Sequence, residues 1–200
     1  MTRWVIAVGV VAAGFVGVVG PSPAAAQVEG GWAVGAQGGV GLFVGNGSDF
    51  LDGGPSLDVT VSRSVAPFLR IRADGALALL DDQKDPFEAA DNRILLFGLG
   101  PEAHLDLGAI GLYVRGLVGR AAAVQVRTNS VLEERTTWTW VYGGGAGVRV
   151  RLSSALFLDA GGDVFKLGEL DFARTASSSL ALMEDPGLLR LRAGVWLAIG

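Results

Sequence analysis

Charged residues recur at every second position of several segments of this chain, and these side chains are the first candidates for chemistry. Arginine and carboxylate groups form bidentate ion pairs, and pairing neutralises charges that would be costly to bury alone. The alternation therefore predicts a structural ion-pair network inside an enclosed space. Its predicted members are Arg70, Arg72, Arg115, Arg149, Arg151, Arg190 and Arg192, with Asp58, Asp74, Glu102, Asp159 and Asp163.

Catalytic and metal-binding residues are sparse. His104 is the only histidine, which excludes a site built from several histidines. The chain has no cysteine, which excludes a disulfide, a thiolate metal site and a cysteine nucleophile. His104-Leu105-Asp106 has no serine beside it, and no segment supplies an obvious set of serine, histidine and acid. We therefore predict a structural histidine, no enzymatic activity, no cofactor and no metal.

Three further motifs have simpler interpretations. The acidic stretch from Asp81 to Glu88 could hold a divalent cation. It lacks the glycine and glutamate spacing of an EF-hand, so we interpret it as a solvated loop. Gly143-Gly144-Gly145 lacks the lysine and the helix of a phosphate-binding loop. Asn46-Gly47-Ser48 is interpreted as a turn sequence.

The segments that position the charged residues alternate with period two. One face is apolar or small, and the other is charged or glycine-rich. Such alternation over about ten residues is typical of β-strands with two different faces. The predicted strands are Trp32–Val44, Leu57–Ser62, Leu69–Leu79, Leu95–Leu105, Leu112–Gly119, Trp138–Arg151, Leu156–Phe165 and Leu189–Ile199.

The connections between these eight strands alternate in length. Long connections follow Val44, Leu79, Val124 and Lys166, and short connections follow Ser62, Leu105 and Arg151. Transmembrane barrels have short periplasmic turns and long extracellular loops, whereas a Greek-key sandwich gives no reason for this regularity. The sequence thus predicts an all-β fold, an eight-stranded antiparallel up-and-down transmembrane β-barrel.

The N-terminus has the features of a secretory signal peptide. Arg3 precedes the uncharged apolar run Trp4–Gly20, and a proline pair and the small residues Ala24–Ala26 follow. An uncleaved helical anchor is the alternative, but the alanine triplet favours cleavage after Ala26. We expect a signal peptide at residues 1–26 and a barrel domain at residues 27–200. The formal net charge of −4 excludes a strongly basic nucleic-acid-binding protein.

Alternation alone does not say which face points outward. A soluble periplasmic barrel of the lipocalin type would place its apolar face inside. The export signal, the mixed signs on the charged face and the scarcity of lysine in the strands favour an apolar face toward lipid. In that phase Trp138, Trp140 and Tyr142 point outward and resemble an interfacial girdle.

With these features the chain resembles the small outer-membrane β-barrels of Gram-negative bacteria, such as the transmembrane domain of outer-membrane protein A. The resemblance covers Gln27 to Gly200 and consists of the alternation and the connection lengths. It implies a location in the bacterial outer membrane, contact with outer-membrane lipid and lipopolysaccharide, insertion by the barrel-assembly machinery and a monomeric state. Such barrels usually end in an aromatic residue, whereas this chain ends in Trp196-Leu197-Ala198-Ile199-Gly200.

The predicted function is a structural or surface-interaction barrel that acts through its extracellular loops. The alternatives are a narrow channel for small or apolar solutes and a soluble periplasmic lipocalin-like ligand-binding barrel. An eight-stranded barrel is just wide enough to be filled by its side chains, which argues against a general pore. The predicted register sets three neighbouring charge pairs: Glu102 facing Arg115, Asp58 beside Arg72, and Arg149 diagonal to Asp159.

Overall fold

The structure is a computed structural model that describes residues 31–44, 53–80, 90–127, 135–168, 170–173, 180–183 and 186–199. Within these residues, eight strands close into an antiparallel barrel and two short strands form a separate hairpin. The same residues contain no helix long and apolar enough to cross a membrane. The barrel strands are β1 Trp32–Val44, β2 Gly54–Ala66, β3 Leu69–Leu80, β4 Ala90–Asp106, β5 Ile110–Arg127, β6 Arg135–Arg151, β7 Leu156–Leu167 and β10 Gly187–Ile199; the hairpin strands are β8 Leu170–Ala173 and β9 Leu180–Met183.

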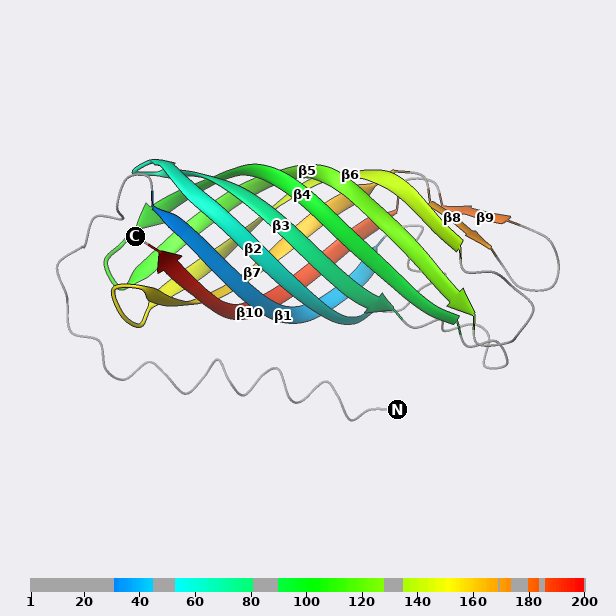
Figure 1. Ribbon diagram of the computed structural model, residues 1–200, viewed down its shortest axis with the longest axis horizontal. Helices are drawn as coiled ribbons and strands as arrows, with labels where there is room; N and C mark the ends of the chain where they lie inside the picture. The colour runs from blue at the N-terminus through cyan, green and yellow to red at the C-terminus, as the bar shows by residue number, and fades with distance from the viewer. Residues whose placement is uncertain are drawn as a thin grey trace.

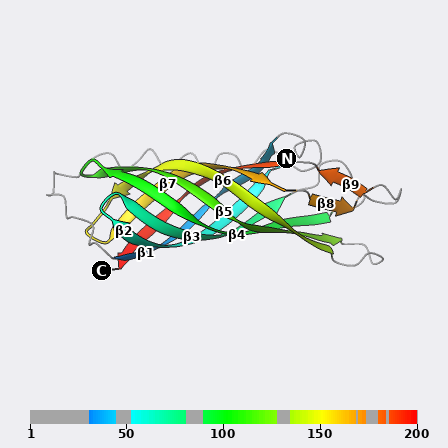
Figure 2. The same cartoon turned by 90° about the horizontal axis from the view of Figure 1, so that it is seen from above.

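Each barrel strand pairs with its neighbour in sequence, and β10 closes the barrel by pairing with both β7 and β1. The first and last strands meet along their whole length, from Trp32 opposite Ile199 to Val44 opposite Gly187. The strands wind obliquely around a common axis, and β8 and β9 lie beyond one end of the barrel (Figures 1 and 2). The predicted eight-stranded antiparallel up-and-down barrel is therefore confirmed.

The two ends of the barrel differ. At one end, here called the turn end, the strands are joined by Pro67–Phe68, by Leu107–Ala109 and by Leu152–Ala155. Gly108, in the second turn, has a φ of 91°, a left-handed conformation that favours glycine. β1 begins and β10 ends at the turn end (Figure 1). The long connections leave the opposite end, the loop end, as the sequence predicted.

The turn between β2 and β3 lies later in the chain than predicted. Strand alternation continues through Ser64, which points inward, and Val65, which points outward, so β2 extends to Ala66. Pro67 then begins a two-residue turn, since proline fixes the φ angle that a first turn position requires. The later turn, together with a register irregularity between Ser64 and Ala66, places Asp58 opposite Ala76. The predicted placement of Asp58 beside Arg72 was therefore wrong.

The hairpin of β8 and β9 lies in a stretch that was predicted to be a loop. Leu170 pairs with Met183, and Ala173 pairs with Leu180. The two strands have four residues each, which is too short for alternation to distinguish a strand from a loop.

Alternation along the barrel strands separates an apolar outer wall from a buried interior. Trp140 is 62% exposed and Leu191 is 50% exposed, and Leu158 also points outward. Trp138 and Tyr142 point outward beside Trp140, as the predicted phase required. Residues at the intervening positions are mostly buried, and these inward side chains form the core of the protein.

Candidate functional site

The interior of the barrel has three layers along its axis. Near the turn end Ala33, Phe157 and Trp196 form a small aromatic layer. The middle layer consists of charged and polar side chains. Toward the loop end the interior is apolar, and this apolar cluster consists of Phe43, Ala76, Ala78, Leu80, Ile94, Leu96, Leu117, Ala121, Ala123, Val141, Phe165, Leu167 and Leu188.

The middle layer contains a closed ring of alternating charges, which we call the charged ring. Each member makes ion pairs with two members of opposite sign, and the N···O distances between successive members lie between 2.5 and 3.2 Å. The side chains come from β3, β4, β5, β6, β7 and β10, so the ring ties together strands on opposite sides of the barrel. In order around the ring the members are Asp163, Arg192, Asp159, Arg149, Glu102, Arg72, Asp74 and Arg115, which returns to Asp163.

Glu102 is bound by two arginines of the ring, and one of them, Arg149, binds both of its carboxylate oxygens. Its Oε1 accepts a hydrogen bond from Arg149 Nη1 at 2.6 Å, and its Oε2 accepts from Arg149 Nη2 at 2.8 Å. Oε2 also accepts from Arg72 Nη1 at 3.0 Å. The residue is 0% exposed, so these donors replace water completely. Arginine suits this position because its planar guanidinium presents two parallel N–H groups.

Asp163 links the ring to a further ion pair. Its carboxylate accepts from Arg115 Nε at 2.7 Å, from Arg192 Nε at 2.8 Å and from Arg190 Nη2 at 3.3 Å. Arg190 in turn makes an ion pair with Asp58. Three guanidinium groups thus share one buried carboxylate, and Asp58 supplies a second negative charge beside them.

Neutral polar side chains complete the network. Tyr113 donates from Oη to Asp159 Oδ1 at 3.1 Å, and Gln37 Nε2 donates to the same oxygen at 2.5 Å. Thr60 donates from Oγ1 to Asp74 Oδ1 at 2.7 Å. A carboxylate has about four lone-pair sites, so these donors satisfy positions that the arginines leave open. The charges of the ring are thus compensated by hydrogen bonds as well as by opposite charge.

Aromatic side chains pack against arginines of the charged ring on its turn-end side. The guanidinium carbon of Arg149 lies 3.8 Å from the ring centroid of Trp196 and 4.4 Å from that of Tyr113. Arg72 lies 5.1 Å from the centroid of Trp196. Such cation–π contacts strengthen when both groups are desolvated. Gly147 leaves room for the Tyr113 ring, since a Cβ at this position would collide with its hydroxyl.

Ten of the twelve predicted network residues meet in the ring and its Asp58–Arg190 extension. The other two lie nearer the turn end. Arg70 is buried, with its guanidinium 6.0 Å from the centroid of Trp196. Arg151 lies at the mouth of the barrel, where it makes an ion pair of 2.9 Å with the partly exposed Asp106.

The backbone register between β4 and β5 was predicted correctly, but the ion pair that it implied was not. Glu102 is opposite Arg115, yet Glu102 binds Arg149 and Arg72 instead. Inward side chains of a narrow barrel converge on its axis, so a long side chain reaches partners on distant strands. Arg149 was expected diagonal to Asp159; the two are directly opposite and make an ion pair of 2.8 Å.

Sequence reasoning missed three members of the network: Gln37, Thr60 and Tyr113. Each lies at an inward position of the same period-two alternation as the charged residues. The signal was therefore present in the phase of the strands, although uncharged side chains did not stand out.

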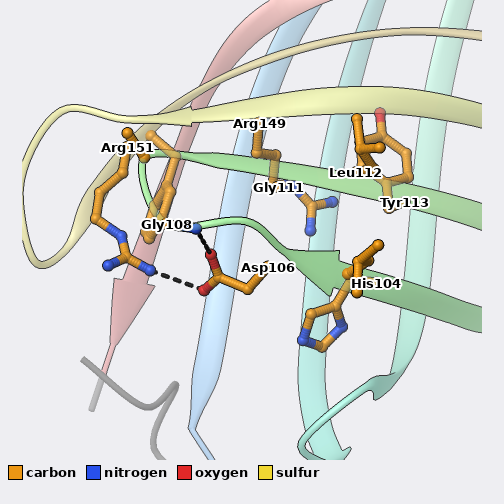
Figure 3. A pocket seen from close by; sticks show the side chains of 11 residues that line it. His104, Asp106, Gly108, Gly111, Leu112, Tyr113, Arg149 and Arg151 are labelled. Atoms are coloured by element: carbon orange, nitrogen blue, oxygen red, sulfur yellow. Dashed lines mark hydrogen bonds and ion pairs between the residues drawn. The ribbon is translucent and has the colours of Figure 1, made fainter. Parts of the chain in front are cut away.

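A pocket opens at the turn end, and Figure 3 shows its lining. Asp106 accepts hydrogen bonds there from the backbone N–H of Gly108 at 3.1 Å and from Arg151 at 2.9 Å. His104 and Tyr113, opposite each other on β4 and β5, also line it. The lining contains no serine or threonine, so it does not supply a serine nucleophile for His104.

No metal-binding group is found in the described part of the chain, where no three His, Cys, Asp or Glu residues gather in a way that could hold an ion. The acidic stretch from Asp81 to Glu88 and the Asn46–Ser48 turn lie outside the described residues. The side chains that the structure describes fill the cross-section of the barrel with compensated charges and packed apolar groups, and the ion pairs of the charged ring link its strands across the lumen.

The fold of this chain is similar to the folds of several solved proteins. No protein-family profile and no curated protein sequence matches the chain. Among solved structures, Neisserial surface protein A is 17% identical, with a TM-score of 0.65 over 83% of this chain and 96% of that one. Ail, the attachment invasion locus protein of Yersinia pestis, is 13% identical, with a TM-score of 0.57 over 86% and 99%. The outer membrane protein OprG from Pseudomonas aeruginosa is 11% identical, with a TM-score of 0.52 over 85% and 96%.

Proposed function

We propose that this chain, which has the fold of the small eight-stranded outer-membrane β-barrels, spans a bacterial outer membrane as a closed barrel. The observation that carries the proposal is the inversion of polarity: the wall exposes apolar side chains such as Val114, at 60%, and Leu191, while the charged ring lies inside. A soluble lipocalin-like barrel would have the opposite arrangement. In lipid, only a closed barrel or a helix satisfies its backbone hydrogen bonds.

The closed lumen argues for a structural or surface-interaction role without catalysis. The charged ring fills the middle of the barrel, and the apolar cluster fills the loop-end half with side chains such as Phe165 and Leu188, both about 1% exposed. Side chains fill the interior of an eight-stranded barrel readily, because its diameter leaves no space for a wide aqueous path. Function then belongs to the long connections at the loop end, as it does to loops on rigid scaffolds generally.

The names of two proteins with this fold fit such a role, since one is a surface protein and the other is named for attachment and invasion. We propose that residues 1–26 are a signal peptide cleaved after Ala26, and that residues 27–200 form the barrel domain. The partners we propose are outer-membrane lipid, lipopolysaccharide and the barrel-assembly machinery, and the barrel acts as a monomer.

Single-channel recording tests the closed lumen. Folded protein inserted into planar bilayers in concentrated KCl should give no steady conductance. A shift in gel mobility on heating verifies that the inserted sample is a folded barrel. Steady openings of uniform size from folded protein would overturn the closed-barrel proposal and favour a channel.

Cysteine labelling in intact cells tests the membrane topology, because the chain has no cysteine of its own. Thr136→Cys, an exposed position at the loop end of β6, should react with a membrane-impermeant maleimide. Ser153→Cys, an exposed position in a turn, should react only after lysis. Equal labelling of both in intact cells would contradict the proposed orientation. The intact mass of the same samples should show a chain that begins at Gln27.

A further inference from the structure

In the part of the barrel wall whose side chains the structure describes, few outward residues are charged, and their sign is uniform. Among the outward-facing side chains that the structure describes, the charged ones are Arg63, Arg93, Arg120 and Lys166. All four are exposed and basic. If the few charged residues of a lipid-facing wall were placed at random, both acidic and basic residues would occur. The excess of basic residues therefore requires an explanation.

Three of these cations lie together at the loop-end half of one side of the barrel. Arg120 on β5 is flanked in the sheet by Phe97 on β4 and Trp140 on β6, and its guanidinium lies 4.9 Å from the Trp140 ring centroid. Lys166 on β7 is opposite Tyr142 on β6. We call Arg120, Lys166, Trp140 and Tyr142, with Arg93 beyond them on β4, the basic aromatic patch.

The other side of the barrel lacks these features at the same level. Among the described residues, its outward positions there are aliphatic, with Leu42 and Val44 on β1 and Leu189 on β10. A general requirement for interfacial anchoring would distribute cations and aromatic rings around the whole circumference. The patch is confined to β4 through β7, which indicates a site with a particular occupant.

The depth of the patch matches a lipid headgroup. Arg120 lies ten residues along β5 from Ile110 at the turn end. A strand rising about 3.3 Å per residue at a tilt of about 45° climbs roughly 23 Å over that length. The apolar band of such barrels is about 25 Å tall. The guanidinium of Arg120 therefore sits at the edge of the band on the loop side, where headgroups begin.

The spacing suits a single anionic group held by two cations. Arg120 and Lys166 are two strands apart, with Trp140 opposite the first and Tyr142 opposite the second. Strand spacing of about 4.8 Å and a rise of about 3.3 Å put their Cα atoms roughly 12 Å apart. Both side chains are long enough to meet over the aromatic surface of β6 between them. Arginine and lysine both bind phosphate oxygens through charge-assisted hydrogen bonds.

We propose that the basic aromatic patch is a binding site for the phosphate group of an anionic lipid in the leaflet on the loop side. The aromatic rings support the acyl chains and glycerol or sugar region, and the two cations bind the phosphate. The inference rests on the proposed membrane location.

Lipid titration monitored by native mass spectrometry tests the site. Folded protein in zwitterionic micelles is titrated with dioleoylphosphatidic acid and, separately, with dioleoylphosphatidylcholine. The phosphatidic acid should bind preferentially, and Arg120→Gln with Lys166→Gln should weaken its binding by about 25-fold, since each cation contributes about fivefold near an anionic lipid. Inorganic phosphate at 10 mM (roughly a hundredfold above the lipid) should not displace it.

Arg63→Gln is the matched control, because Arg63 also lies over an aromatic ring, that of Trp32, at 5.5 Å but at the turn end. It should leave phosphatidic acid affinity within twofold of the original protein. Equal binding of the two lipids, equal weakening by Arg63→Gln, or displacement by inorganic phosphate would each overturn the proposal. Heat-modifiable mobility of every variant tests the barrel separately, so loss of lipid preference in a folded, membrane-inserted protein leaves the proposed function standing.

Discussion

Glu102→Gln should open the charged ring without changing the shape of the interior. The substitution keeps the side-chain volume but removes the charge that faces Arg149 and Arg72, and it places an NH₂ group toward one of them. Glu102 is 0% exposed, so water does not reach the site to compensate. Removing one partner of a buried ion pair typically costs 3–5 kcal/mol, because the remaining charge is left without compensation.

The loss here should fall near the lower end of that range, at about 3 kcal/mol. Arg149 keeps its ion pair with Asp159 at 2.8 Å, and Arg72 keeps Asp74 at 2.7 Å. A double-mutant cycle with Arg149→Met isolates the pair. The free energy of unfolding of the double variant should fall by about 2 kcal/mol less than the sum of the two single decreases. The reason is that each single variant leaves the other member of the pair buried without its partner.

Urea unfolding in lipid vesicles, followed by tryptophan fluorescence, measures these free energies. Asp106→Asn is the matched control: its ion pair with Arg151 is partly exposed, and asparagine can still accept from the N–H of Gly108. It should cost less than about 1 kcal/mol. If Glu102→Gln costs no more than Asp106→Asn, or if the coupling with Arg149 is zero, the charged ring is not the stabilising unit inferred from its geometry.

Two further predictions concern the wall and the interior packing. Leu191→Arg, two residues from the middle of β10 and 50% exposed, should lower the free energy of unfolding in bilayers by about 2–4 kcal/mol, whereas Ile199→Arg at the strand end should cost about 0–1 kcal/mol. Equal effects would contradict the assignment of the wall to lipid. Gly147→Ala should cost about 1–3 kcal/mol because its Cβ meets the Tyr113 hydroxyl, whereas Gly116→Ala, with nothing within 4 Å, should stay within about 0.5 kcal/mol. If the two alanine variants unfold at the same urea concentration, the interior accommodates the extra methyl group at position 147 without loss of stability.

The strand pattern carried enough information to predict the barrel, because a membrane wall requires an apolar residue at every second position. Trp32–Val44 was predicted with its observed bounds, and Trp138 pointed outward as expected. Strand ends were less well predicted. β5 runs to Arg127 and β4 begins at Ala90, since strands that project beyond the apolar band no longer need the alternation.

Ion-pair partners were harder to predict than ion-pair members. A single turn position sets the register of a whole hairpin, so placing the β2–β3 turn too early put Asp58 beside Arg72 instead of opposite Ala76. Even a correct register, such as Glu102 opposite Arg115, does not identify the contact. Neighbouring strands determine which residues share a row, but side chains inside a closed barrel select partners across the axis. That selection depends on the curvature of the whole sheet.

The layered interior stabilises the barrel through side chains that lie in its strands. The charged ring packs against Trp196 on the turn-end side, where Arg149 also lines the pocket, and against the apolar cluster, including Phe165 and Leu117, on the loop-end side. Burial of the ring members lowers the local dielectric constant, which strengthens each ion pair and couples the pairs to one another. All eight members of the ring lie in strands, so changes in the long connections should leave the ion pairs between these members intact. The loop end can therefore vary in sequence while the ring continues to hold the barrel closed.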